Sequence, residues 1–395
     1  MKKFKYFFIP IFVIIIFGFI FNNYINKKYD SLIEKKDLSY VRHTYNEIVR
    51  DRGGVLKDKM REEGDLMLLG SSELSSPVNQ NPINMFPNNY SNYDVSIYGR
   101  AHTQSVQHAS ILGNISNLNK DDKIAIVISA QWFEQSWGID GNNFTVNFSE
   151  QQFYDFFNNE KIDKENKIYY AKRVAELLKE SGEFLEERIY SELYYRDNLT
   201  SKAILTFLKP YYSFKEYMLD IKDRVQTVKL LEGLEDKKEV AIKNIDWNEE
   251  FIKAEEEAKE KVTNNDIYVD DEYYDTYLRD IYESLKDISK NIDLTKSREM
   301  KDYEFLLNTC KDLGIEPLII LMPVNGLYYD HLGLSVEKRT EFYNKIEEMT
   351  KEHGFDVLNL QDKEYEKYYL SDVMHLGWKG WLNIDEEMSK YFKGK

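Results

Sequence analysis

Five short runs of apolar residues, separated by stretches with helical spacing, constrain the fold of this chain more than any other feature. Continuous apolar runs are typical of strands whose two faces are both covered. The runs are Leu66–Leu69, Tyr93–Tyr98, Lys123–Ser129, Pro317–Met322 and Asp356–Leu360. Helical spacing extends from Val106 to Leu118, from Val336 to His353 and from Trp378 to Phe392. Strands that alternate with helices predict an α/β fold, with a parallel sheet of about five strands flanked by helices.

Residues 149–300 interrupt this alternation and are rich in Glu, Lys and Tyr. Helical spacing covers Tyr169–Leu178 and Ile204–Leu219, the second with a break or kink at Pro210, and the acidic run Glu249–Glu260 predicts a solvated helix face. The expected loops are Asp246–Trp247 and Asn265–Asp275. The interval is predicted to be a large helical insertion that divides the α/β domain into residues 64–148 and 301–395.

The amino terminus carries an almost purely apolar run, Tyr6–Phe21, behind three lysines. We interpret residues 1–28 as a cytoplasmic tip and a single transmembrane helix, which places the main domain outside the cell membrane. A cleaved signal peptide is the alternative, but the run is not followed by a small-x-small cleavage pattern. Residues 29–63 are polar with helical spacing and a break near Gly53–Gly54, which predicts a helical stalk or connector.

The composition excludes several classes of protein. A chain of 395 residues with 42% hydrophobic content can bury a real core, and its net charge of −16 argues against binding to nucleic acid. The single cysteine, Cys310, excludes a disulfide framework and is expected to be buried. His102, His108 and His331 lack partners at a metal-ligand spacing, and no phosphate or dinucleotide loop is present, so no metal or cofactor is predicted.

Polar or glycine residues follow every predicted strand, at what should be one edge of the sheet. Ser72 follows the first strand, Gly99 the second, Gln131 the third and Asn325 the fourth, and Asp372 and His375 follow the fifth. An Asp three residues before a His can orient the imidazole, whose other nitrogen can then remove a proton from a serine hydroxyl. The sequence therefore predicts a Ser72-His375-Asp372 triad, although a surface turn and a helix cap are the simpler readings of the two motifs.

Acyl chemistry also needs hydrogen-bond donors for the developing oxyanion. The candidates are Gly99, the backbone N–H of Ser72 and the side chain of Gln131, while Gly99 could instead end a strand and Gln131 could cap a turn. The candidate substrate-binding residues are Asn325, Trp132 and Tyr328. Asn325 has an alternative role in an Asx turn. Two further tryptophans, Trp378 and Trp381, are expected to pack the last helix onto the sheet.

Four of these motifs resemble, in the same order, those of the DltD family of D-alanyl-lipoteichoic acid biosynthesis proteins. They are Gly70–Leu74, Ser129–Phe133, Pro323–His331 and Ser371–Trp381. The resemblance implies a fold like that of SGNH hydrolases, with a flavodoxin-like sheet and Ser72 as the nucleophile. The first motif reads Gly-Ser-Ser where Gly-Asp-Ser is usual, so the choice of Ser72 over Ser71 depends on that alignment. Gln131 stands where SGNH enzymes commonly carry Asn.

The function that the resemblance implies is transfer of D-alanine to lipoteichoic acid on the outer face of a Gram-positive cell membrane, without a cofactor. The D-alanyl group would arrive from a DltB-like membrane acyltransferase, with the D-alanyl carrier protein as a further partner, and would be held on Ser72 as an ester. Two alternatives stay open. One is an esterase or thioesterase with the same triad, and the other is a non-catalytic scaffold for the acyltransferase complex.

Overall fold

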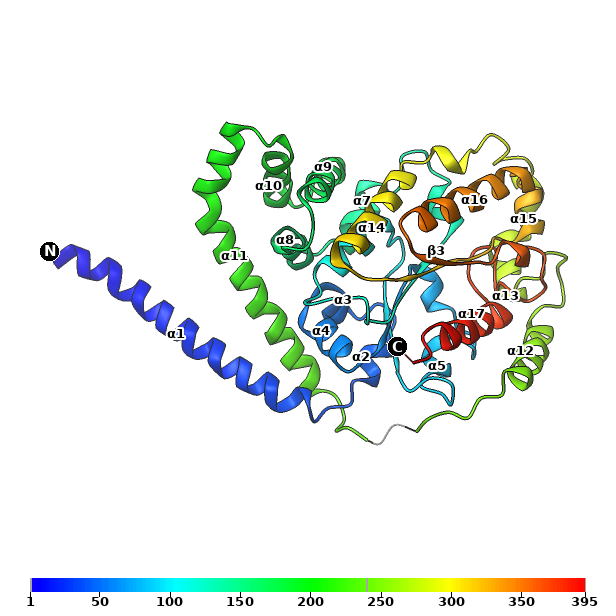
Figure 1. Ribbon diagram of the computed structural model, residues 1–395, viewed down its shortest axis with the longest axis horizontal. Helices are drawn as coiled ribbons and strands as arrows, with labels where there is room; N and C mark the ends of the chain where they lie inside the picture. The colour runs from blue at the N-terminus through cyan, green and yellow to red at the C-terminus, as the bar shows by residue number, and fades with distance from the viewer. Residues whose placement is uncertain (1, 239–240, 395) are drawn as a thin grey trace.

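The centre of the molecule is a parallel five-stranded sheet in the order β2-β1-β3-β4-β5. The structure, a computed structural model, describes residues 2–238 and 241–394 (Figure 1). The strands are β1 Leu66–Leu69, β2 Val95–Tyr98, β3 Ile124–Ile128, β4 Leu318–Leu321 and β5 Asp356–Asn359. The predicted α/β architecture and all five predicted strands are confirmed, with four of the strands one or two residues shorter than expected.

Helices and short turns surround the sheet. The α-helices are α1 Lys2–Ile33, α2 Ser39–His43, α3 Ile48–Arg52, α4 Val55–Glu62, α5 Pro82–Met85, α6 Ser105–Gly113, α7 Gly141–Asn147, α8 Glu150–Asn158, α9 Lys164–Ser181, α10 Leu185–Arg196, α11 Leu199–Glu232, α12 Trp247–Lys261, α13 Asp271–Tyr273, α14 Glu299–Leu313, α15 Gly326–His331, α16 Val336–Glu352 and α17 Trp378–Tyr391. The 3₁₀ helices are η1 Ser72–Ser75, η2 Ala130–Phe133, η4 Tyr282–Leu285, η5 Leu294–Lys296 and η6 Gln361–Lys363, and η3 Tyr274–Leu278 is a π-helical turn.

Alternate residues of each strand face two separate cores, because successive side chains of a strand point to opposite faces of the sheet. Met67 and Leu69 face the core that α6, α14 and α16 cover, whereas Leu66 and Leu68 face the core that α5 and α17 cover. Figure 1 shows α14 and α16 on one side of the sheet and α5 and α17 on the other. The buried Trp381 belongs to the second core, so its predicted packing role is confirmed.

The interval between β3 and β4 is largely helical, and its first half packs on the sheet rather than standing apart. Its aromatic side chains join the first core, and Cys310 of α14 is buried there as predicted. The helix α11 runs through Pro210 without a break. The expected loop at Asp246–Trp247 is wrong at Trp247, because the Asp246 carboxylate caps α12 and the helix begins at once. The expected loop at Asn265–Asp275 ends in α13 and η3.

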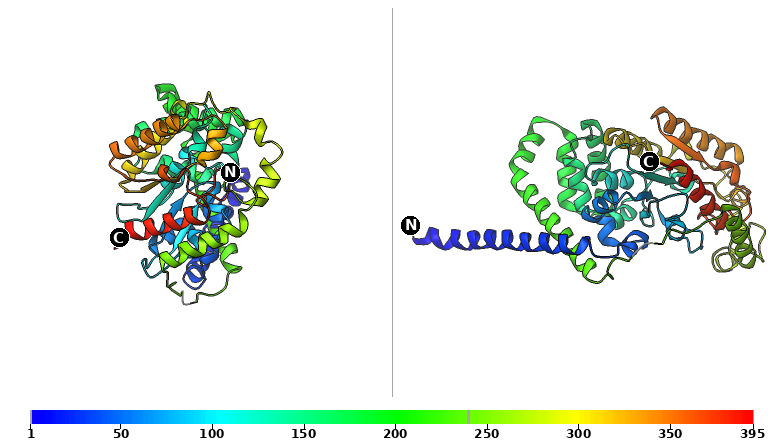
Figure 2. Two further views of the ribbon diagram at one scale, coloured as in Figure 1. Left: turned by 90° about the vertical axis from the view of Figure 1, so that its right-hand side faces the viewer. Right: turned by 60° about the horizontal axis from the view of Figure 1, so that its bottom comes forward.

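The amino-terminal helix α1 projects away from the body, with the N-terminus at its far end (Figures 1 and 2). Ile25 and Ile33 near its other end are buried, and Lys28 pairs with Glu232 of α11. Among the residues whose side chains are described, no helix combines the length and the apolar character needed to cross a bilayer, so the expected transmembrane helix is not found there. Of that expected span, residues 6–11, 14 and 15 lie outside the residues whose side chains are described.

The interval expected to be a helical stalk is divided into the end of α1 and the short helices α2, α3 and α4. The predicted break at Gly53–Gly54 is confirmed, and it has a tertiary cause. The Asp223 carboxylate of α11 accepts hydrogen bonds from the N–H groups of Gly54 and Val55 at 2.8 and 3.1 Å, and so caps α4. A Cβ at Gly53 would lie 2.0 Å from an oxygen of the same carboxylate. A side chain at position 53 would therefore displace the Asp223 carboxylate from the cap of α4.

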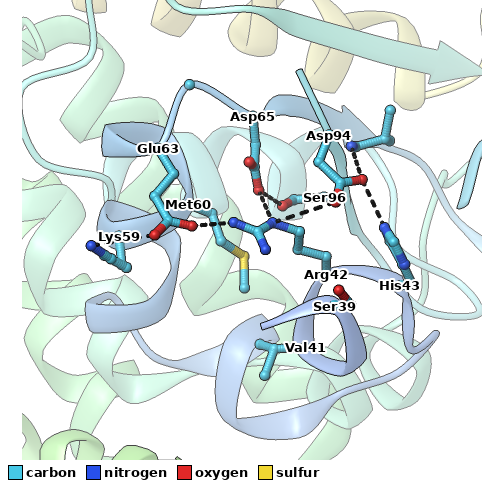
Figure 3. Close-up of polar contacts among 12 residues, drawn as sticks. Ser39, Val41, Arg42, His43, Lys59, Met60, Glu63, Asp65, Asp94 and Ser96 are labelled. Atoms are coloured by element: carbon cyan, nitrogen blue, oxygen red, sulfur yellow. Dashed lines mark hydrogen bonds and ion pairs between the residues drawn. The ribbon is translucent and has the colours of Figure 1, made fainter. Parts of the chain in front are cut away.

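A buried ion cluster attaches α2 to the amino-terminal ends of β1 and β2 (Figure 3). The Arg42 guanidinium donates to Asp65 at 2.7 Å and pairs with Glu63. Asp65 also accepts a hydrogen bond from the hydroxyl of Ser96, a residue of β2. Burial raises the pKa of Asp65, and the charge and hydrogen bond of Arg42 oppose that rise. The guanidinium therefore stabilises the buried carboxylate in its charged form.

Replacing Arg42 with Ala should lower the free energy of unfolding by about 3–5 kcal/mol, because Asp65 would remain buried without a counter-charge. Urea unfolding followed by circular dichroism measures the change. Arg196→Ala is the matched control, since Arg196 pairs with Glu192 on the exposed face of α10. That variant should lose less than about 1 kcal/mol. Equal losses in the two variants would contradict the role assigned to the cluster.

Candidate active site

The turn after β1 presents Ser72 at the start of η1 and turns Ser71 inward. Ser71 is buried, its N–H donates to the Glu73 carboxylate at 2.6 Å, and its hydroxyl donates to the carbonyl of Arg100 at 3.2 Å. The turn is tight because β1 and β2 end against each other. Gly99 has a φ of +140°, and a Cβ there would lie 1.8 Å from the carbonyl oxygen of Gly70. Only glycine fits at position 99.

The loop after β5 forms a closed turn that presents Asp372 and His375. The N–H of Ser371 donates to the carbonyl of His375 at 2.9 Å, which closes the turn. One Asp372 oxygen accepts the N–H groups of Met374 and His375, both at 2.8 Å, and the other oxygen accepts from the ring nitrogen Nδ1 of His375 at 2.7 Å. The carboxylate therefore fixes both the backbone of the turn and the orientation of the imidazole.

The structure brings these two segments together. The Nε2 atom of His375 lies 2.9 Å from the hydroxyl oxygen of Ser72, across 303 residues of sequence. The hydroxyl of Ser76 donates to the carbonyl of Leu376 at 2.8 Å, which holds the turn after β1 against the loop after β5. Ser72, His375 and Asp372 thus form one hydrogen-bonded chain, in the geometry that lets an imidazole act as a base toward a serine.

The surroundings of His375 stabilise the protonated form of its imidazole. Burial alone would lower the pKa of His375, but the hydrogen bond and charge of Asp372, together with the charge of Glu73, raise it above its ordinary value of 6.5. Glu73 is itself buried, and burial raises its pKa. A raised pKa makes His375 a stronger base toward the Ser72 hydroxyl.

A cavity of 490 Å³ opens beside Ser72. Trp132 and Gln131, from η2 after β3, line it together with Met374, and the Gln131 amide donates to the Met374 sulfur at 3.1 Å. Trp132 is buried and packs against His108, with 5.5 Å between the ring centroids. Two of the predicted residues, Gln131 and Trp132, therefore share a cavity with Ser72. Gly99 is not among the residues that line it.

The other two predicted substrate-binding residues lie outside this cavity. Asn325 caps α15, because its Oδ1 accepts the N–H of Tyr328 at 3.0 Å, and its Nδ2 donates to the carbonyl of Ile267 at 2.8 Å. Both ends of the amide are thus used within the fold, as the Asx-turn alternative expects. Tyr328 packs near Tyr282 in a small cluster with Val373.

Two further residues at the site escaped the sequence analysis, Glu73 next to Ser72 and Glu134 three residues after Gln131. Glu134 lines the same cavity and accepts a hydrogen bond from the Tyr329 hydroxyl at 2.5 Å. The signal for Glu134 was its spacing from Gln131 at the end of a predicted strand. Among the described residues, no group of three or more His, Cys, Asp or Glu side chains is arranged to hold a metal ion.

The structure defines a class of α/β proteins in which a parallel sheet carries a Ser-His-Asp hydrogen-bonded chain at its carboxyl edge. Within that class the chain belongs to the DltD protein family, whose model matches residues 43–393.

Curated relatives match most of the chain. Protein DltD of Bacillus subtilis (strain 168) is 29% identical over 343 residues, which cover 87% of this chain and 86% of the relative. Protein DltD of Staphylococcus aureus (strain NCTC 8325 / PS 47) is 27% identical over 348 residues, or 87% and 85% of the two chains. Protein DltD of Lacticaseibacillus rhamnosus is 23% identical over 347 residues, or 87% and 81%. The family match over residues 43–393 spans all five strands and the two segments that carry Ser72, Asp372 and His375.

A phosphonate probe for serine nucleophiles should label Ser72 and not Ser71, because only the Ser72 hydroxyl faces His375. Peptide mass spectrometry locates the adduct. Ser72→Ala should abolish labelling, whereas the matched variant Ser71→Ala should retain at least half of the labelling rate. Labelling that survives in Ser72→Ala would contradict the assignment.

Replacing Asp372 with Asn should slow labelling of Ser72 by roughly 10³- to 10⁴-fold, by analogy with other Ser-His-Asp sites. Since His375 must be neutral to accept a proton, the rate should fall as the pH drops through its pKa. Asp372 raises that pKa. The acid limb of the pH–rate profile should therefore move to lower pH in Asp372→Asn. An acid limb that stays in place would show that Asp372 does not tune His375.

Proposed function

We propose that this protein transfers D-alanine to lipoteichoic acid outside the cytoplasm through an ester on Ser72. Membership of the DltD family supports the pathway, and the 2.9 Å contact between Ser72 and His375 is the observation that supports the mechanism. A scaffold would have no need for a nucleophile, a base and an orienting carboxylate in one hydrogen-bonded chain. The proposal concerns the domain that follows α1 and does not depend on how the chain reaches the membrane surface.

In the first half-reaction His375 Nε2 takes the Ser72 proton as the serine oxygen attacks the D-alanyl carbonyl of the donor. The tetrahedral intermediate collapses, the bond to the donor's leaving oxygen or sulfur breaks, and His375 returns the proton to that atom. In the second half-reaction a hydroxyl of the polymer gives its proton to His375 and attacks the Ser72 ester. Ser72 recovers its proton when it leaves. Bonds and protons balance without a cofactor, since one ester replaces another.

Stabilisation of the oxyanion is proposed to come from the Gln131 side chain and the backbone N–H groups of Ser72 and Gly99. The Gln131 amide now donates to the Met374 sulfur, which is a weak acceptor. Exchanging that contact for an anionic oxygen costs little. The Met374 contact also keeps the Gln131 amide within the cavity that Ser72 lines.

The proposed donor is a DltB-like membrane acyltransferase or the D-alanyl carrier protein, and the proposed acceptor is lipoteichoic acid. The net charge of −16 disfavours a general attraction to a polyanion, so the acceptor must be bound locally. An acyl-enzyme open to water would hydrolyse, and residues 149–300 are proposed to shield it and to bind the acceptor. The helix that directly precedes this interval, α7, begins beside the cavity, where Asp140 caps it and lines the cavity wall.

The test is to replace the chromosomal gene with one that encodes Ser72→Ala and to measure ester-linked D-alanine on lipoteichoic acid. D-alanylation should fall to the level of a deletion strain while the protein remains at its normal level. The matched control, Ser71→Ala, should keep most of the D-alanine. Normal D-alanylation in Ser72→Ala cells would favour a scaffold. Free D-alanine released by the purified domain, with no transfer between polymer chains, would favour an esterase or thioesterase.

A further inference from the structure

Glu134 is one of the residues that line the cavity beside Ser72. Glu134 directly follows η2, a 3₁₀ helix that begins where β3 ends. A 3₁₀ helix has three residues per turn, so Gln131 and Glu134 occupy the same side of it. Both residues line the cavity with Ser72. A substrate whose carbonyl lies at Ser72 would thus find an amide and a carboxylate side by side.

Among the described residues, the carboxylate of Glu134 has no ion-pair partner. One oxygen of Glu134 accepts a hydrogen bond from the neutral Tyr329 hydroxyl, and in the part of the chain that the structure describes no Lys, Arg or His pairs with Glu134. The cavity lining contains neither Lys nor Arg, and His102 is its only histidine within the described residues. Burial raises the pKa of Glu134, and the Tyr329 hydrogen bond opposes the rise. Such a carboxylate gains stability from a cation supplied by a ligand.

The second acid of the cavity, Asp140, is already used by the fold. Its Oδ1 accepts the N–H groups of Asn142 and Asn143 at 2.9 and 3.0 Å, and its Oδ2 accepts from the Asn143 side chain at 2.6 Å. Asp140 therefore serves as the cap of α7. Glu134 remains the carboxylate of the cavity with capacity for a ligand.

We propose that Glu134 binds the ammonium group of an α-aminoacyl substrate and so selects D-alanyl groups over neutral acyl groups. The inference rests on the proposed function, in which the acyl group is D-alanyl. In an α-aminoacyl ester the nitrogen lies only about 2.5 Å from the carbonyl carbon, by ordinary bond lengths and angles. A carboxylate that recognises it must share a cavity with the nucleophile, as Glu134 does. A neutral acyl group would leave that carboxylate buried without a cation.

The test compares D-alaninamide with 2-methylpropanamide, in which a methyl group replaces the ammonium. Dissociation constants are measured by NMR titration for the wild-type protein, Glu134→Gln and the control Glu165→Gln, which removes an exposed carboxylate of α9. The wild type and the control should prefer D-alaninamide by about 10- to 100-fold, and Glu134→Gln should lose that preference. Equal binding of the two amides by the wild type, including undetectable binding of both, would overturn the proposal. So would an unchanged preference in Glu134→Gln.

A second measurement separates this inference from the transfer reaction. The 4-nitrophenyl esters of D-alanine and of 2-methylpropanoate are offered to the protein, and adducts on Ser72 are quantified by mass spectrometry. Equal acylation of Ser72 by both esters would support Ser72 as the nucleophile and would overturn the role of Glu134. Absence of any adduct, with Glu134-dependent binding of D-alaninamide, would keep the ammonium site and overturn the transfer. If Glu134→Gln does not fold, Glu134→Asp, which keeps the charge, should retain the preference for D-alaninamide.

Discussion

The contact between Ser72 and His375 depends on a loop that crosses the carboxyl edge of the sheet. β5 is the edge strand farthest from β2, whereas Ser72 follows β1, so the chain after β5 must pass β4 and β3 to reach it. Close backbone packing holds this crossing in place. A Cβ at Gly377 would lie 2.6 Å from the backbone of Leu370, and a Cβ at Gly380 would lie 2.2 Å from the carbonyl of Tyr369. Gly377 and Gly380 therefore allow the loop to pass this close to the backbone of Tyr369 and Leu370.

The carboxylates around the cavity suit a reaction in which His375 becomes positively charged and the substrate carries an ammonium group. Asp372 and Glu73 favour the imidazolium that His375 becomes when it takes the serine proton, and Glu134 offers a place for a substrate ammonium. The same carboxylates repel phosphate. A polyanionic acceptor can therefore present a hydroxyl to Ser72 only if its phosphates are held elsewhere, which agrees with the overall charge of −16.

The sheet could be predicted because each strand is a short apolar run, and the site because parallel strands place their carboxyl ends together. The predictions from the sequence that failed concern features that depend on residues distant in the chain. The short helices between residues 34 and 63 depend on such partners, and Asp223 of α11 caps the last of them. Asn325 follows its strand as predicted, yet both ends of its amide are used by the fold. The spacing of Glu134 from Gln131 was visible in the sequence, but only the three-dimensional contacts show that no cation among the described residues pairs with it.

The choice between Ser71 and Ser72 shows how geometry decides what a motif leaves open. In a tight turn, adjacent side chains point in different directions, so only one of two neighbouring serines can face the imidazole. Here Glu73 holds the Ser71 N–H, and the Ser71 hydroxyl is directed to the carbonyl of Arg100. The middle position of Gly-Ser-Ser thus needs only a short polar side chain that secures the turn. Ser72 is left at the first position of η1, with its hydroxyl directed to His375.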